Sequence, residues 1–223
     1  MRRGGGGSLI ALINTRHEYQ HLFWIYVPIA IGVVAVVWLL AVLALLRYRR
    51  RPPEEAADWR ENNRLEGGYA VLLGLVVVFL LYLTFTAEHR VDTVSAQERP
   101  ALVINVTGAK WEWTFRYPRY GITQRSGTVG RQPLGVPTGE PVRFNLSSAD
   151  VIHGFFIPEV RFKRDLFPEN TQTVTLSFPN AGTFQASCAE FCGLRHADMT
   201  FVVRAVSPST FARWANSGAR TPV

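Results

Sequence analysis

The sequence predicts a membrane-anchored all-β protein, in which a hairpin of two transmembrane helices precedes a β-sandwich or Greek-key barrel. Three observations carry this prediction. Two long uncharged apolar runs lie in the first part of the chain; after Thr86 the sequence changes to short runs rich in Val, Thr and aromatic residues; and Gly and Pro separate those runs. At 223 residues, 48% of them hydrophobic, the chain has room for one globular domain beside the helices.

Each apolar run is long enough to form a transmembrane helix. Leu22 to Leu46 carries no charge and corresponds to about 37 Å of helix. Tyr69 to Thr86 is also uncharged and corresponds to about 27 Å, a little under the usual hydrocarbon thickness. A buried core helix and, for the first run, a cleaved signal peptide are the alternatives. Both runs exceed the usual core of a signal peptide, and no small-residue cleavage site follows the first.

The arginines beside these runs predict the orientation. A cluster of arginines directly follows the first run, between residues 47 and 51, whereas the other ends of the runs carry few. Because arginine-rich loops stay in the cytoplasm, we expect the loop 47–68 there and both flanking segments outside. The predicted organisation is an N-terminal extramembrane segment 1–21, a transmembrane hairpin 22–86 (spans 22–46 and 69–86) and an extracytoplasmic β domain 87–223.

The clearest predicted strand is Lys110 to Tyr117, where four aromatic residues alternate with polar ones. A period of two places the aromatic side chains on one face, so an antiparallel β domain is expected. The Pro-, Gly- and Arg-rich segment Pro118 to Gly139 is expected to be a loop or hairpin, and a last helix is expected between Ser207 as N-cap and Gly218. The other predicted strands are Leu102 to Val106, Val142 to Leu146, Val151 to Ile157, Thr171 to Phe178, Gly182 to Ala186 and Thr200 to Ala205.

The segment "SCAEFCGLRHADMT", residues 187 to 200, holds the only two cysteines, Cys188 and Cys192, with His196 and Met199 close behind. Outside the cytoplasm, a disulfide is the simplest interpretation of two cysteines four positions apart. Thiolate, imidazole and thioether together, however, are the soft ligands that suit copper, and a weak axial Met is typical of copper electron-transfer sites. Zinc sites rarely use Met.

The second cysteine points to more than one metal ion. A mononuclear copper site of this kind uses one Cys, two His and a Met, so one thiolate would be surplus. Two thiolates can instead bridge a pair of copper ions, and a pair needs a second histidine. His153, in "SADVIHGFFIP", lies on a predicted strand ahead of Cys188 and is the candidate, although a lone histidine among apolar residues is more often part of a core.

These residues resemble subunit II of the haem–copper cytochrome c oxidases, whose copper loop has the pattern C-x-E-x-C-x-x-x-H-x-x-M. The upstream "D-V-x-H" element, the helical hairpin, the "WEWTF" strand and the terminal "FARWA" helix extend the resemblance over nearly the whole chain. It implies a cupredoxin-like domain with a binuclear copper A centre. Such a centre accepts electrons from a c-type cytochrome or similar donor and passes them to haem in a catalytic subunit that reduces oxygen. The loop pattern is met here by Cys188, Glu190, Cys192, His196 and Met199.

The resemblance also implies a role for each ligand. The two cysteines would bridge the copper ions, His153 and His196 would bind one ion each, Met199 would be axial, and the main-chain carbonyl of Glu190 would complete the set. The Glu190 side chain matches one that reaches a Mg or Mn ion at the junction with the catalytic subunit. A solvated loop carboxylate is the alternative for this side chain.

Two further residues match functional positions of the family. Trp111 matches an exposed aromatic residue at which electrons enter, although aromatic strand residues usually belong to a core. Trp113 is expected to be mainly a packing residue. Glu66, in "NNRLEGGY", matches a glutamate at the mouth of a proton pathway, with a charge at the level of the lipid headgroups as the alternative.

The partners implied are a catalytic haem-bearing subunit I, other oxidase subunits and membrane lipid, with no nucleic acid. The location implied is a bacterial inner membrane, with the copper domain on the periplasmic side. One departure concerns the donor: relatives that use a basic soluble cytochrome c carry acidic side chains just after the aromatic strand, where this chain has Arg116, Arg119, Arg125 and Arg131. Arginines repel a basic partner, so we expect an acidic or neutral cytochrome, a tethered one, or a donor within a supercomplex.

A membrane-anchored copper-delivery or assembly module with a Cys188–Cys192 disulfide is the alternative function. Nitrous oxide reductase carries a similar copper loop, but it needs a His-rich propeller domain that five histidines exclude. No C-x-x-C-H motif occurs, so no fused c-type haem is expected. Relatives that oxidise quinol lack the copper ligands that this chain keeps.

Overall fold

The computed structural model describes the chain except for residues 1–14, 50–60 and 218–223. Predictions for those residues, which include most of the N-terminal segment, part of the predicted cytoplasmic loop and Gly218, lie outside the described residues. Two compact units are present. Glu18 to His89 form a helical unit, and the β domain begins at Arg90 and also includes the first residues of the first helix.

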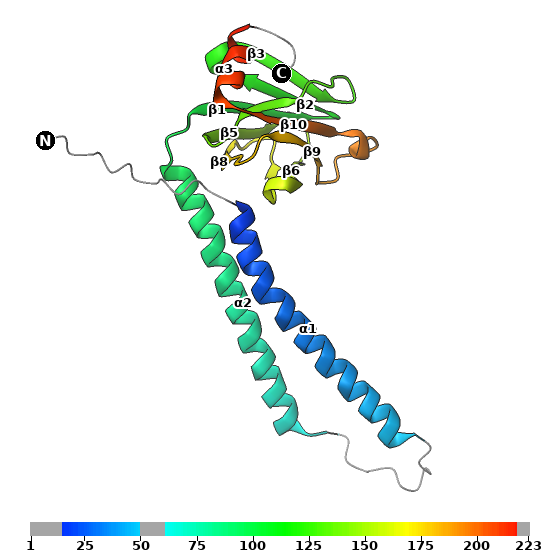
Figure 1. Ribbon diagram of the computed structural model, residues 1–223. Coiled ribbons are helices and arrows are strands. Elements are labelled where there is room, and N and C mark those ends of the chain that lie inside the picture. Colours follow the sequence, from blue (N-terminus) through cyan, green and yellow to red (C-terminus); the bar gives the residue numbers. More distant parts are fainter. Residues whose placement is uncertain (1–14, 50–60, 218–223) are drawn as a thin grey trace, which may run out of the picture. The chain divides into compact units, whose positions relative to one another are not determined.

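The helical unit contains most of α1 (Thr15–Tyr48) and α2 (Asn63–Gln97), drawn side by side in Figure 1. Both helices extend beyond the two predicted apolar runs into polar flanks. Both are long and apolar enough to cross a membrane, and almost none of their apolar surface is buried within the protein. The Tyr26 hydroxyl of α1 donates to the carbonyl oxygen of Leu80 of α2 at 2.7 Å. Such a contact joins two helices in an apolar medium, because neither polar group finds water there.

The β domain is a sandwich of two five-stranded sheets, which confirms the predicted fold class (Figure 1). One sheet has the order β3-β2-β1-β5-β8 and the other β4-β10-β9-β6-β7. The strands are β1 (Leu102–Ala109), β2 (Glu112–Tyr117), β3 (Ile122–Gly127), β4 (Leu134–Pro137), β5 (Pro141–Ser148), β6 (His153–Ile157), β7 (Phe162–Leu166), β8 (Gln172–Ser177), β9 (Gly182–Cys188) and β10 (Thr200–Val206).

Two strand pairs are parallel, so the expectation of an antiparallel domain is wrong in part. β1 pairs with β5 in parallel, with Leu102 opposite Val142, and β10 pairs with β4 in parallel, with Val203 opposite Leu134. A parallel pair cannot be closed by a tight hairpin, because the second strand must start at the same end as the first. The chain therefore crosses from one sheet to the other several times, which is the wrapping of a Greek-key sandwich.

The sequence did not predict three of the strands, and all three lie at sheet edges: β3, β4 and β7. β3 and β4 fall in the segment that was expected to be a loop or hairpin. β3 buries the polar side chains of Gln124 and Ser126, so it shows no apolar alternation. β7, "FKRDL", carries three charged residues. Edge strands commonly carry charged side chains, which remove the apolar signal that marks a central strand.

The aromatic face of β2 lies in the centre of the core. Trp113, Phe115 and Tyr117 are fully buried, which confirms the predicted alternation. On the opposite sheet Phe155 and Phe201 form a stacked pair, with ring centroids 5.1 Å apart. Aromatic side chains bury large apolar areas and pack in fixed geometries, so this core is a rigid base for the strands above it.

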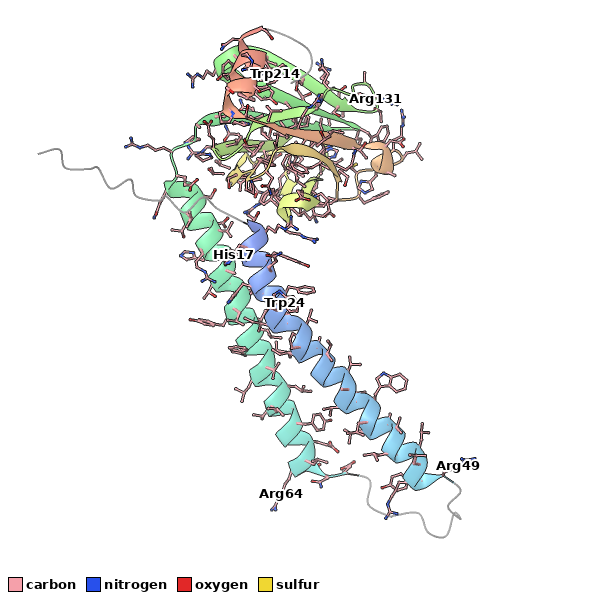
Figure 2. All side chains as sticks on the ribbon, viewed as in Figure 1. His17, Trp24, Arg49, Arg64, Arg131 and Trp214 are labelled. Carbon is pink, nitrogen blue, oxygen red and sulfur yellow. The ribbon has the colours of Figure 1, made fainter. Side chains whose placement is uncertain are left out.

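The last helix, α3 (Pro208–Ser217), covers one end of the β domain. The backbone N–H of Thr210 donates to Ser207 Oγ at 3.3 Å, so Ser207 is the N-cap as predicted. Trp214 packs edge-on against Tyr117, with ring centroids 5.4 Å apart. Figure 2 shows Trp214 and Arg131 at opposite ends of the domain.

Candidate metal centre

Two of the predicted ligands are carried by neighbouring strands. His153 is the first residue of β6 and Cys188 is the last residue of β9. The two strands are antiparallel partners, with Phe155 opposite Cys188. The backbone N–H of Ala189 also donates to the carbonyl oxygen of Gly154 at 2.9 Å. A Cβ atom on Gly154 would lie 2.8 Å from a backbone atom of Ala189, so the two strands approach this closely only because residue 154 is glycine.

The other ligands lie on the loop between β9 and β10. Ser187 and Thr200 pair at the base of this loop, and Cys188 N–H donates to the carbonyl oxygen of Met199 at 2.9 Å. Gly193 has a φ of 114°, a conformation that favours glycine, and it lets the chain turn back. The N–H of His196 then donates to the carbonyl oxygen of Gly193 at 3.1 Å. The loop is therefore held in shape by its own backbone hydrogen bonds.

All the predicted copper ligands converge. Cys188 Sγ lies 3.8 Å from His153 Nδ1, 3.9 Å from Cys192 Sγ and 3.3 Å from the carbonyl oxygen of Glu190. Cys192 Sγ lies 3.5 Å from His196 Nδ1 and 3.8 Å from Met199 Sδ. The ligand atoms of His153, Cys188 and Cys192 all lie within 4.8 Å of one another, and all three residues are buried. Each cysteine therefore faces one histidine and one further donor.

The two sulfur atoms are not bonded to each other. Both cysteines are free, and their 3.9 Å separation is far longer than the roughly 2.05 Å of a disulfide. Metal–thiolate bonds are about 2.3 Å long, so two sulfurs that share one ion lie no more than about 4.6 Å apart. The observed separation fits sulfurs that share metal ions. The soft character of the donors, two thiols, two imidazoles and a thioether, suits copper.

Asp150 positions the first histidine. Its Oδ1 lies 2.8 Å from His153 Nε2, and its two oxygens also accept the backbone N–H groups of Lys110 and Val151 at 2.8 and 2.6 Å. When the ring is neutral and Nε2–H donates to this carboxylate, Nδ1 is the unprotonated nitrogen that faces Cys188. A carboxylate behind a ligating histidine sets the orientation and the tautomer of its ring. Sequence reasoning included Asp150 in a motif without giving it this role, although its spacing from His153 was a signal.

Without metal, the pKa values of the two thiols are shifted in opposite directions. Burial raises the pKa of Cys188, but hydrogen bonds from His153 and the nearby backbone outweigh it and lower the pKa to about 6. Burial and the charge of Cys188 raise the pKa of Cys192 to about 12. Burial lowers the pKa of His153, yet Cys188 and Asp150 raise it overall. Two adjacent thiolates repel each other, so ionising both requires positive charge between them.

Two tryptophans contact the loop: Trp113 on β2, and Trp111, which lies just before β2 because the strand begins at Glu112 and not at the predicted Lys110. The indole N–H of Trp113 donates to the carbonyl oxygen of Met199 at 3.2 Å, and its ring is fully buried. The indole N–H of Trp111 donates to the carbonyl oxygen of Cys192 at 3.3 Å, but its ring is only partly buried. The two residues make the same kind of bond, but only Trp111 also reaches solvent.

The Glu190 side chain points away from the sulfurs and is paired. Its Oε2 lies 3.2 Å from Lys163 Nζ, which also lies 3.3 Å from Asp165 Oδ1. Hydrogen bonding to Glu190 raises the pKa of Lys163 despite a small opposing effect of burial. Sequence reasoning missed Lys163, because β7 itself was not predicted.

Glu66 belongs to the helical unit. Asn62 precedes α2, and its Oδ1 accepts the N–H of Leu65 at 3.1 Å, while Glu66 Oε1 accepts the N–H of Asn62 at 3.4 Å. These reciprocal bonds are of the capping-box kind, which satisfies free backbone donors at a helix start. Glu66 therefore has a local structural role beside the one implied by its resemblance.

The fold and the ligand set together define a membrane-anchored cupredoxin-like protein with a potential copper site. Residues 124–206 match the family described as cytochrome c oxidase subunit II, periplasmic domain. The probable cytochrome c oxidase subunit 2 of Streptomyces coelicolor is 29% identical over 82% of this chain and 69% of its own length. The cytochrome c oxidase subunit 2 of Bacillus sp. strain PS3 is 32% identical, over 79% of this chain and 52% of its own length.

A solved structure supports the same assignment. The periplasmic domain of subunit II of cytochrome oxidase of Bradyrhizobium japonicum aligns with a TM-score of 0.52 at 27% identity, covering 54% of this chain and 95% of that domain. The chain belongs to the cytochrome c oxidase subunit II family, and it is thus subunit II of a haem–copper oxidase.

Proposed function

We propose that this chain is the electron-accepting subunit of its oxidase, and that Cys188 and Cys192 together would hold two copper ions. His153, His196, Met199 and the Glu190 carbonyl would be the other ligands. The convergence of these donors, with adjacent atoms 3.3 to 3.9 Å apart, is the observation that carries the proposal. When bound, the copper pair would supply a one-electron centre whose charge is spread over two ions and two sulfurs.

The protein's contribution would be rigidity. Electron transfer is fast when the ligands move little between the oxidised and the reduced state. His153 is held by Asp150 and buried under β2, while Met199 and Cys192 are tied through their carbonyls to buried or half-buried indoles. Donors whose positions are set by packing and by such supporting hydrogen bonds keep their geometry.

Trp111 would be the point at which electrons enter. Its indole reaches solvent on one side and donates to the Cys192 carbonyl on the other, so it connects the surface with a ligand in a single contact. Trp113 has the equivalent contact with Met199 but is fully buried, which supports a packing role. Electrons would then pass to haem in the catalytic subunit, where oxygen is reduced; this chain would not reduce oxygen itself.

Copper content and spectroscopy of the intact oxidase test the proposal. Purified complex should hold two copper ions per subunit II in addition to the copper of the catalytic subunit, and it should show the purple absorption and the unpaired-electron signal of a mixed-valence pair. Cys192→Ser should remove that signal, because one sulfur cannot replace two bridges. A Val129→Ser variant, exposed and outside the cluster, is the matched control. A single copper ion per subunit, or copper that the protein hands on to another protein during assembly, would contradict the proposal.

We further propose that Glu190 contributes one ligand to a Mg or Mn ion, with the remaining ligands supplied by the catalytic subunit. Hard carboxylate oxygens suit these ions. In the chain by itself, Lys163 already neutralises this carboxylate. The ion would therefore have to displace the Lys163 ammonium group or bind the carboxylate beside it. Metal analysis of a Glu190→Gln oxidase would show how far Mg or Mn binding depends on this side chain.

Glu66 is proposed as the mouth of a proton pathway, and its capping bond suggests how to test this. Glu66→Gln removes the titrating carboxyl but keeps a side chain that can still cap the helix, whereas Glu66→Ala removes both. If Glu66 relays protons, both variants should slow steady-state oxygen consumption. If Glu66 only caps α2, the glutamine variant should turn over like the unmodified enzyme and the alanine variant alone should lose stability.

The location proposed is the inner membrane of a bacterium, with the β domain on the periplasmic side. Support comes from the two apolar helices and from the arginines at the end of α1, of which Arg47 and Arg49 are described. The partners proposed are the haem-bearing catalytic subunit, other oxidase subunits, lipid, and a c-type cytochrome or similar donor that is not strongly basic and is either free, tethered or held in a supercomplex.

A further inference from the structure

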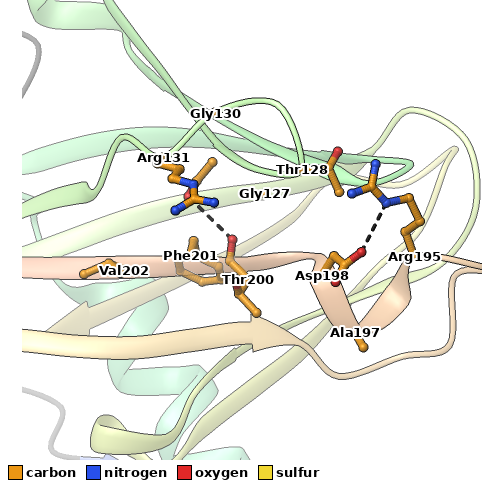
Figure 3. Close-up of a pocket in the computed structure, with 11 residues that line it drawn as sticks. Gly127, Thr128, Gly130, Arg131, Arg195, Ala197, Asp198, Thr200, Phe201 and Val202 are labelled. Atoms are coloured by element: carbon orange, nitrogen blue, oxygen red, sulfur yellow. Dashed lines mark hydrogen bonds and ion pairs between the residues drawn. The ribbon is translucent and has the colours of Figure 1, made fainter.

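A pocket of about 480 Å³ lies directly beside the copper loop. One wall is the end of β3 and the turn after it, and the other is the end of the copper loop with the start of β10. The lining residues are Ser126, Gly127, Thr128, Gly130 and Arg131 on the first wall, and Arg195, Ala197, Asp198, Thr200, Phe201 and Val202 on the second. Figure 3 shows Arg131 and Arg195 at opposite ends of this pocket, with Asp198 and Thr200 between them. None of the proposed copper ligands lines the pocket, so copper binding does not account for the charged side chains in it.

The pocket has positive charge that the protein does not neutralise. Arg131 is exposed, and among the described residues no ion pair or side-chain hydrogen bond engages its guanidinium. Arg195 Nε donates to Asp198 Oδ2 at 3.1 Å, but both side chains are more than half exposed, so solvent screens this pair. The pocket is therefore lined by two guanidinium groups and one carboxylate, and a second carboxylate from outside would balance the charge.

Trp111 does not line the pocket, but it is bonded to one wall of it and to the copper loop. The N–H of Thr128 donates to the carbonyl oxygen of Trp111 at 3.1 Å, and the Trp111 indole donates to the carbonyl oxygen of Cys192 at 3.3 Å. The ring also lies against Gly193, where an added Cβ would be 3.4 Å from it. A partner that covers both the pocket and the copper loop would therefore come close to the partly exposed indole.

Exposed apolar side chains flank the same place. Val129, on the turn, is 83% exposed, and Leu194, on the copper loop, is 94% exposed. A small anion would neutralise the arginines but would leave both of these side chains in water. A protein surface would cover them, and an apolar centre with a charged rim is the usual anatomy of a protein interface.

We propose that this pocket, with Val129 and Leu194, is the docking surface for an acidic electron-transfer protein, one of whose carboxylates binds between Arg131 and Arg195. The inference rests on the proposed function, since it assumes that electrons enter at Trp111. Arginine pairs with carboxylate in a bidentate geometry, which sets orientation as well as affinity. Complementary charge mainly raises the rate of encounter and selects the partner.

The test uses the intact purified oxidase and two soluble c-type cytochromes of similar reduction potential, one acidic and one strongly basic. Rapid mixing measures the second-order rate of copper-centre reduction as a function of salt. The acidic protein should react faster at low salt and slow down as salt rises, because screening removes the attraction. Arg131→Glu and Arg195→Glu should each lower its low-salt rate about tenfold and raise that of the basic protein.

Arg213→Glu is the matched control, because it reverses the charge of an exposed arginine on α3, at the other end of the domain. Each rate is divided by the rate with a small neutral photoreduced flavin, which reports whether the copper centre itself is intact. If the flavin fails to reduce any copper centre in the unmodified oxidase, the proposed function fails. If the flavin reduces it but the arginine variants react with the acidic cytochrome at the same rate as Arg213→Glu, the docking surface is wrong. It is also wrong if the rate with the acidic cytochrome does not depend on salt and free citrate still blocks the reaction, because the pocket would then bind only a small anion.

Discussion

The two halves of the ligand cluster are built in different ways. His153 and Cys188 are held by neighbouring strands of one sheet. The buried Trp113 ring packs against the His153 ring, and the Asp150 carboxylate binds His153 Nε2. Cys192, His196 and Met199 lie on a loop that is held by its own backbone bonds and by two indoles. Among the described residues, His196 has no carboxylate partner comparable to Asp150; its ring lies 5.9 Å from the exposed Phe191 ring.

This difference indicates that one half of the cluster contributes to the stability of the domain and the other half to metal binding and electron transfer. The strand half is part of the folding core, so damage to it should affect the whole domain. The loop half is close to solvent and to Trp111, so damage to it should affect metal binding and electron transfer more than folding.

The largest effect is expected from Trp113→Ala, because Trp113 supports both halves. Its ring centroid lies 6.1 Å from His153 and 5.3 Å from Phe201, and its N–H bonds to Met199. Removing a fully buried tryptophan lowers the free energy of unfolding by about 3–5 kcal/mol. Denaturant unfolding of the full chain in detergent measures this, with Trp113→Phe as the milder control. A loss of copper without a loss of stability would place Trp113 in the loop half alone.

Gly154→Ala should damage the strand half next. The new methyl group would lie 2.8 to 3.0 Å from the backbone of Ala189 and Glu190, so the strands must separate, at a cost of about 1–3 kcal/mol. Gly193→Ala is the matched change in the loop, where the nearest atom is 3.4 Å away but φ is 114°. We expect Gly154→Ala to lower the melting temperature more than Gly193→Ala. The opposite order would show that the loop, not the strands, limits stability.

Asp150→Asn should weaken copper binding about 10- to 100-fold, the usual effect of removing the support of a ligating histidine. The neutral amide keeps the size of the side chain but no longer favours the Nδ1-free tautomer of His153. Competition with a copper chelator, followed by absorption, measures the affinity. Unchanged affinity would mean that packing against Trp113 alone orients the ring.

Asp198→Asn should have the smallest effect and serves as the control for Asp150→Asn. Asp198 is an exposed carboxylate on the loop, and its pair with Arg195 is solvent-screened. Such surface pairs contribute about 0–1 kcal/mol, so melting temperature and chelator competition should hardly change. A large loss of copper would show that the Arg195–Asp198 pair holds the loop in shape.

Much of the site was readable from the sequence because its ligands are of unusual chemical types at short spacing. Cys188, Cys192, His196 and Met199 lie on a single loop, so their order along the chain already placed them together. The aromatic alternation of β2 and the apolar runs of α1 and α2 are local patterns. The two helices contain the predicted runs and extend beyond them, and β2 begins two residues after the start of the predicted strand. The N-cap at Ser207 is equally local.

The features that were not readable depend on neighbours distant in sequence. The edge strands β3, β4 and β7 have no apolar period of their own, and partners from elsewhere in the chain pair with them. The parallel pairing of β1 with β5 and the Glu190–Lys163 pair follow from the crossing of the chain between sheets. The pocket beside Trp111 exists because the turn after β3 meets the copper loop.

The sequence by itself determined the ligand types, the two apolar helices and the aromatic face of the central strand, because composition and period are properties of contiguous residues. Only the tertiary structure decided that His153 and Cys188 face each other, that the two sulfurs stay 3.9 Å apart, and that Trp111 reaches solvent while Trp113 does not. Distances between side chains on different strands are set by sheet order and register, which a linear pattern does not encode.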